Sequence, residues 1–135
     1  MVILRTHALM GLFIGCWGLC AAAEEPAKPL TPIEARTKVG EEITVEMTVQ
    51  VAKDRLEKRG EIYLDAESDF RDSGNFAVVI TRAGADALRA QGIADPASRF
   101  MGKLIRARGV VKVVQDVPRI EIASAEQIEI VELKP

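Results

Sequence analysis

The sequence feature that most constrains the fold is a stretch of alternating apolar and polar residues at positions 43–51. Its odd positions are all apolar and its even positions are all polar. The apolar residues are Ile43, Val45, Met47, Val49 and Val51. Such alternation is typical of a β-strand with one face in the core and the other in water. Because the stretch is long for a globular strand, we predict that it bends, as the first strand of a small barrel must.

Further strands are predicted from the same kind of pattern, bounded by turn residues. They cover residues 61–66, 76–81, 103–114 and 117–123, and a last extended segment covers residues 127–132. Residues 82–92 change to helical spacing, which predicts one helix that Thr81 caps and Gly92 ends. Its apolar positions are Ala83, Ala87 and Leu88.

Local signals mark the ends of these elements. Thr31 and Glu34 fit a capping box around a short helical turn. Pro96 fits the first position of another short helical turn. Gly109, inside a long strand, indicates a bulge or a barrel corner. A tight turn that holds Pro118 is expected between the last two long strands.

The predicted order is therefore β-β-β-α-β-β with a C-terminal extension. A helix between strands three and four of a five-stranded Greek-key barrel is the arrangement of the oligonucleotide/oligosaccharide-binding (OB) fold. The segments GKLIRARG (102–109), PRIEI (118–122) and Gln127-Ile128 resemble the last two strands of many bacterial OB-fold domains. The segment YLDAESDFRD (63–72), with Asn75-Phe76, resembles small exported OB-like proteins of unassigned function.

The resemblance covers about residues 39–132 and implies an all-β fold, an OB-like barrel with one helix. We expect this barrel domain at residues 39–133. Residues 24–38 are rich in proline and charge, and we interpret them as a flexible tether that can hold a short helix.

Residues 1–23 have the order of a secretory signal peptide. The first residues include the basic Arg5, and an apolar run follows at residues 8–20. Three alanines at 21–23 and then Glu24 come after it. The run is short for a bilayer span, so we expect export to the periplasm or medium, with no stable membrane span after cleavage. An uncleaved anchor is one alternative. Residues 13–16 also resemble a lipobox, so a lipoprotein anchored through Cys16 is another.

Both cysteines, Cys16 and Cys20, lie in this leader, as do His7 and Trp17. A mature chain would then lack the residues for a Ser-His-Asp or Cys-His site and for a thiolate metal site. No glycine-rich phosphate loop of the usual spacing is present. We therefore expect no catalytic residue and no cofactor. The formal net charge of −2 gives no global attraction to nucleic acid.

An acidic loop is the best metal candidate. Its carboxylates are Asp65, Glu67, Asp69 and Asp72, and alternating oxygen ligands suit calcium. The preferred interpretation is a solvated turn in which Asp69 and Asp72 cap backbone donors. No metal ligand is assigned.

Basic residues supply the best binding candidates. Arg106, Arg108 and Lys112 are expected on one strand face, and residues 53–60 form a charged loop after the first strand. That loop and the loop before Arg119 flank the ligand face of OB folds. Alternatively, Glu42 and Glu46 can pair across to Arg106 and Arg108 and neutralise them. For stacking on bases only Tyr63 is a strong candidate, because Phe70, Phe76 and Phe100 are assigned to core or loop anchoring.

We therefore predict a non-catalytic binding module of the cell envelope. Its ligand would be single-stranded nucleic acid, a glycan, another anionic polymer or another protein. The predicted ligand-binding residues are Thr44, Glu46, Thr48, Lys53, Arg55, Tyr63 and Arg119. One alternative is a structural or interaction domain in which the first strand or the C-terminal segment pairs its exposed edge with a partner or a second copy. A third is a metal-dependent enzyme built on the acidic loop. The oligomeric state stays open.

Overall fold

The computed structural model describes residues 28–132, and in this range the chain is mostly β with four α-helices. The strands are β1 (Glu42–Thr48), β2 (Val51–Arg55), β3 (Glu61–Asp65), β4 (Ala77–Thr81), β5 (Leu104–Val110), β6 (Lys112–Val114), β7 (Val117–Ile122) and β8 (Ile128–Ile130). The helices are α1 (Pro32–Ala35), α2 (Leu56–Arg59), α3 (Arg82–Ala90) and α4 (Pro96–Phe100), and a 3₁₀ turn η2 covers Ala125–Gln127. The expected signal peptide and Cys16 lie outside the described residues.

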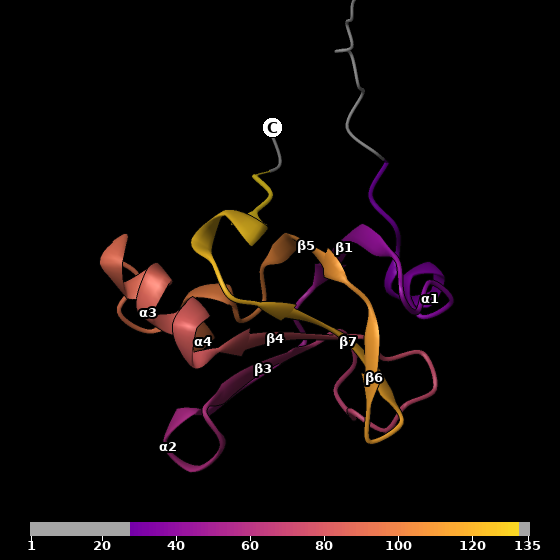
Figure 1. Cartoon of the computed structure of the whole chain (residues 1–135), viewed down its shortest axis with the longest axis horizontal. Helices are drawn as coiled ribbons and strands as arrows, with labels where there is room; N and C mark the ends of the chain where they lie inside the picture. The colour runs from indigo at the N-terminus through magenta and orange to yellow at the C-terminus, as the bar shows by residue number, and fades with distance from the viewer. Residues whose placement is uncertain (1–27, 133–135) are drawn as a thin grey trace, which may run out of the picture.

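The strands form two sheets (Figure 1). One has the order β1-β5-β8 and the other β2-β3-β4-β7-β6. The predicted strand at residues 43–51 pairs directly with the one at residues 103–114, which carries Arg106 and Arg108. In the structure β1 runs antiparallel to β5. The pairing of β4 with β7 is parallel, and the other pairs of named strands in residues 28–132 are antiparallel. Two of the five predicted strands divide, which gives seven strands, and the predicted C-terminal segment supplies the eighth, β8.

The bend predicted in the first strand is confirmed. β1 ends at Thr48 and β2 begins at Val51, and the two segments belong to different sheets. The backbone N–H of Val49 donates to Lys103, before β5, and that of Gln50 donates to Asp65, at the end of β3. The chain therefore passes from one sheet to the other at residues 49–50.

The fourth predicted strand divides too, but two residues after the glycine expected to bend it. Gly109 stays in register opposite Ile43, and the break between β5 and β6 falls at the buried Val111. The glycine at position 109 does not bend the strand but lets β5 pack closely against Ile120. A Cβ at this position would lie 2.6 Å from Cγ2 of Ile120.

The predicted turn at Pro118 is also wrong. Pro118 lies inside β7, opposite Val113. The turn consists of Gln115 and Asp116, both with positive φ (51° and 67°). A two-residue turn with left-handed residues matches the twist of paired strands, so this pair makes the hairpin without proline.

The helix between strands three and four is confirmed, with Thr81 Oγ1 accepting from the N–H of Gly84. Its buried face differs from the predicted one, since Gly84 and Ala85 are buried with Leu88 whereas Ala83 is exposed. A Cβ on Gly84 would lie 2.1 Å from the carbonyl oxygen of Ile122. The missing side chain at Gly84 therefore lets α3 lie directly against β7.

The charged stretch at residues 53–60 is not a loop. Lys53, Asp54 and Arg55 continue β2 in register with β3, and α2 follows, ended by Gly60 at φ 72°. The polar side chains fit a strand because β2 lies at the edge of its sheet. At the N-terminal side, the capping box of Thr31 and Glu34 is present as predicted.

Buried apolar side chains from both sheets form one hydrophobic cluster. Representative members are Val45, Ile62, Ile80, Ile105 and Ile120.

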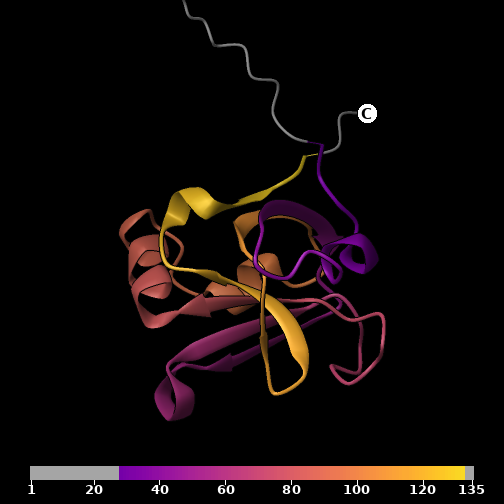
Figure 2. The ribbon, with the colours of Figure 1, turned by 45° about the vertical axis from the view of Figure 1, so that its right-hand side comes forward.

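In residues 28–132 no helix is long and apolar enough to cross a membrane. The β6–β7 hairpin, the loop after β3 and α2 all project toward the lower side of the molecule in two views (Figures 1 and 2).

Candidate ligand-binding groove

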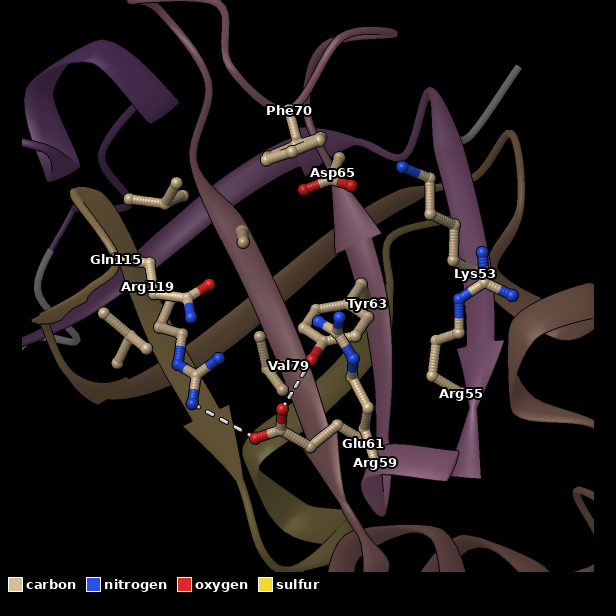
Figure 3. A pocket seen from close by; sticks show the side chains of 13 residues that line it. Lys53, Arg55, Arg59, Glu61, Tyr63, Asp65, Phe70, Val79, Gln115 and Arg119 are labelled. Atoms are coloured by element: carbon tan, nitrogen blue, oxygen red, sulfur yellow. Dashed lines mark hydrogen bonds and ion pairs between the residues drawn. The ribbon is translucent and has the colours of Figure 1, made fainter. Parts of the chain in front are cut away.

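A groove of about 550 Å³ lies on the face of the five-stranded sheet that points away from the core (Figure 3). β2, β3 and β4 contribute to it, as do α2, the loop after β3 and the β6–β7 hairpin. Its lining residues are Lys53, Arg55, Arg59, Glu61, Tyr63, Asp65, Phe70, Ala77, Val79, Val114, Gln115, Val117 and Arg119. We call this site the groove.

One wall of the groove is cationic. Lys53 and Arg55 lie two residues apart on β2, and Arg59 comes from α2. Within residues 28–132, none of these three cations has a carboxylate oxygen within 4.0 Å. Their charges are therefore available to a ligand.

The opposite wall carries a cation that is already neutralised. Arg119 Nη2 lies 3.1 Å from Glu61 and 2.6 Å from Glu121. Lys112 Nζ lies 2.9 Å from Glu121. Burial raises the pKa of Glu121, but the bonds from Lys112 and Arg119 outweigh it and hold the pKa below its ordinary value. Only 12% of the Arg119 side chain is exposed, so this residue stabilises the wall through its ion pairs more than it attracts a ligand.

Tyr63 is fixed on the floor between the walls. Its hydroxyl donates to Glu61 Oε1 at 2.6 Å. Burial, together with this bond, raises the pKa of Tyr63. The ring is thus neutral and held in one orientation, and Figure 3 shows it between the two walls of the groove.

Phe70 provides a second aromatic surface, contrary to the prediction that it anchors the core or a loop. It is 46% exposed and lines the groove. Lys53 Nζ lies 5.0 Å from the ring centroid and the Arg71 guanidinium 5.6 Å from it. The neighbours Asp69 and Arg71 were a sequence signal for exposure, because charged residues on both sides of an aromatic are typical of a solvated loop.

The groove brings together four of the seven predicted binding residues, namely Lys53, Arg55, Tyr63 and Arg119. The other three are elsewhere, because the first long strand leaves this sheet at residues 49–50. Thr44 lies opposite Arg108 on β5. Glu46 and Thr48 border a separate hollow beside the N-terminal segment.

The charge pairing considered for the other sheet is present in part. Arg106 Nε lies 2.9 Å from Glu46 Oε2. Glu42, in contrast, lies opposite Val110, so it does not face Arg108. β5, which carries Arg106 and Arg108, belongs to the three-stranded sheet, and none of its residues lines the groove.

The acidic loop has the predicted turn geometry. Asp69 Oδ1 accepts from the backbone N–H of Arg71, and Asp72 Oδ1 accepts from that of Gly74. In the described part of the chain no group of three or more potential metal-ligating side chains occurs.

No family model matches this sequence, and no curated protein does. Solved structures match by shape. Asparaginyl-tRNA synthetase from Pyrococcus horikoshii superposes with a TM-score of 0.52 at 12% identity, over 78% of this chain and 23% of the synthetase. The structure titled OBody AM1L10 bound to hen egg-white lysozyme superposes with a TM-score of 0.52 at 16% identity, over 82% of this chain and 100% of that one. The chain has an OB-like fold. At these identities the likeness shows the fold alone, and this chain spans about a quarter of the synthetase.

Proposed function

We propose that this OB-like chain is a non-catalytic binding module that takes a short stretch of single-stranded nucleic acid in the groove. The observation that carries the proposal is the combination, in one groove, of two aromatic rings with three cations that form no ion pair within the described residues. Cations along a groove follow a phosphate backbone, and aromatic rings stack on bases of any sequence. Tyr63 and Phe70 would supply the stacking surfaces.

The local charge of the groove differs from that of the whole chain. The net charge of the chain is −2. The lining residues, in contrast, include four cations and two carboxylates. An anionic ligand would therefore be attracted to this face although the protein as a whole repels it.

The fold adds support by analogy. The synthetase that shares it is named for a tRNA. We also propose that the two sheets act as one OB-like barrel with the groove on its wall. The support is that the chain continues from one sheet into the other at residues 49–50 and again at Val111.

Fluorescence anisotropy with the full-length chain and a labelled oligothymidine tests the proposal. We expect binding at low salt that weakens steeply as salt rises. Three phosphate contacts give a slope of about −2 in log affinity against log salt, from about 0.7 per contact on single strands. Arg55→Ala should flatten the slope by about 0.7, whereas Arg89→Ala on α3, outside the groove, should not change it.

No binding at low salt would remove the proposal. Equal competition by heparin would assign the groove to anionic polymers in general rather than to nucleic acid.

A second candidate function is protein interaction through a strand edge. β8 is the last strand of its sheet and pairs only with β5 in the described residues. The OBody structure shows, by its title, a chain of similar fold bound to a protein. The edge of β1, which was the other predicted pairing edge, is partly occupied. Leu30 pairs with it through two backbone hydrogen bonds, to Thr44 and Glu46. Light scattering that shows a monomer at high concentration would contradict self-pairing through β8.

We also propose that the chain is exported, on the pattern in residues 1–23. Protein recovered from the producing cells should then begin at Glu24. A lipidated N-terminal Cys16 would instead identify a lipoprotein, and an intact Met1 would contradict cleavage of the leader.

A further inference from the structure

Asp65 is a buried carboxylate on the floor of the groove that the proposed function does not use. Its exposed fraction is 3%. Oδ1 accepts a hydrogen bond from Asn75 Nδ2 at 3.2 Å. Among residues 28–132 no hydrogen bond to Oδ2 is found. A carboxylate does not donate and has about four lone-pair sites, so Oδ2 is left to accept a donor from a ligand and Oδ1 can accept one bond more.

Asn75 holds the aromatic ring of the loop near this carboxylate. The same Nδ2 group that binds Asp65 also donates to the carbonyl of Phe70, at 3.3 Å. Its Oδ1 accepts from the backbone N–H of Glu67, at 2.9 Å. The amide thereby ties the loop to β3, and Figure 3 shows Phe70 next to Asp65 at one end of the groove.

Lys53 adds a donor at the same place. Its Nζ lies 5.0 Å from the centre of the Phe70 ring, and its charge also acts on the Asp65 carboxylate. An acceptor, a donor and an aromatic surface therefore converge on one corner of the groove. We call these three residues, Lys53, Asp65 and Phe70, the corner.

The corner has the polarity of one base edge in particular. The Watson–Crick edge of guanine places two donors, N1–H and N2–H, beside the acceptor O6, and unpaired bases are recognised through this edge while stacked on aromatic rings. Thymine and uracil place one donor between two carbonyl oxygens, which would repel a carboxylate. Cytosine and adenine each offer a single amino donor next to a ring nitrogen that would face the carboxylate.

We infer that the corner is a base-specificity site that favours guanine in a bound single strand. The base takes the place of the Lys53 ammonium over the Phe70 ring and donates N1–H and N2–H to Asp65. Lys53 then donates to O6 at the edge of the base. This inference rests on the proposed function, since it assigns a specificity to the same groove.

The test compares short oligothymidines with one central position varied, measured by anisotropy with the full-length chain in lithium buffer to prevent guanine quadruplexes. We expect central guanine to bind at least fivefold more tightly than central thymine, adenine or cytosine, the lower end of what a bidentate base contact provides. Inosine lacks the N2 amino group and should lose part of this gain. Asp65→Asn should abolish the preference for central guanine, because an amide can still accept from Asn75 but no longer offers two acceptor oxygens to the base.

The outcomes separate the two proposals. Binding of all oligonucleotides with equal affinity would overturn the inference and leave the proposed function standing. No binding of any oligonucleotide would overturn both. The comparison among bases uses the unmodified protein, so a variant that fails to fold does not remove the test. A guanine preference that survives in folded Asp65→Asn would place base recognition elsewhere.

Discussion

At the scale of single residues, the groove depends on how its charges are compensated. Arg119 is held by two carboxylates, whereas Lys53 lies over an aromatic ring and has no carboxylate within 4.0 Å in the described range. Asp65 is the opposite case, a carboxylate with no cation within 4.0 Å among residues 28–132. Burial raises its pKa, although the hydrogen bond from Asn75 and the charge of Lys53 reduce the effect. The sequence identified Lys53 and Arg119 as binding candidates but not their different states, because the pairing of Arg119 depends also on Glu61, which is distant in the chain.

Replacing Asp65 with asparagine should stabilise the protein at alkaline pH. The folded state holds the Asp65 proton more tightly than the unfolded chain, so this residue's contribution to stability falls as pH rises above the ordinary value of 3.8 and through the raised pKa. Asp65→Asn removes this dependence. We expect its melting temperature to exceed that of the unmodified protein at about pH 8, with a difference that shrinks toward about pH 4. A difference that grows on acidification would contradict the raised pKa.

At the scale of elements, the tightest packing contact is the one between Gly84 of α3 and the backbone of β7. Gly84→Ala should destabilise the fold by about 3 kcal/mol or more, because the new methyl group meets a backbone carbonyl at 2.1 Å, which cannot rotate away. The control is Asp86→Ala on the exposed face of the same helix, expected within about 0.5 kcal/mol of the unmodified protein. Urea unfolding measures both. Equal stability of the two variants would mean that α3 does not pack as described.

The β6–β7 hairpin offers a stabilising change. Asp116 has a φ of 67°, a region that glycine occupies without steric cost. Asp116→Gly should therefore raise stability by up to about 1 kcal/mol, the order of the cost of left-handed backbone for other residues. Thermal unfolding checks this, and Asp72→Gly in the loop after β3 is a control expected to lose stability, because its side chain caps Gly74. A loss in Asp116→Gly would contradict the turn geometry.

At the scale of the whole molecule, periodicity predicted what depends on local pattern. The alternation from Ile43 to Val51 located the first strand and its bend, and the spacing after Thr81 located the helix. The role of Gly109 was not predictable, because it depends on contact with Ile120 in another strand. For the same reason the groove was found only in part. The outward residues of β1 and β2 look continuous in sequence, yet they belong to different sheets.

The most direct test of the account is an NMR titration of the full-length chain with a short oligothymidine at low salt. We predict that amide shifts move at the groove, in Lys53, Tyr63, Phe70 and Arg119, and stay unchanged at Thr44 and Thr48 on the other sheet. Shifts concentrated at those two threonines, or none anywhere, would contradict a nucleic-acid ligand in the groove.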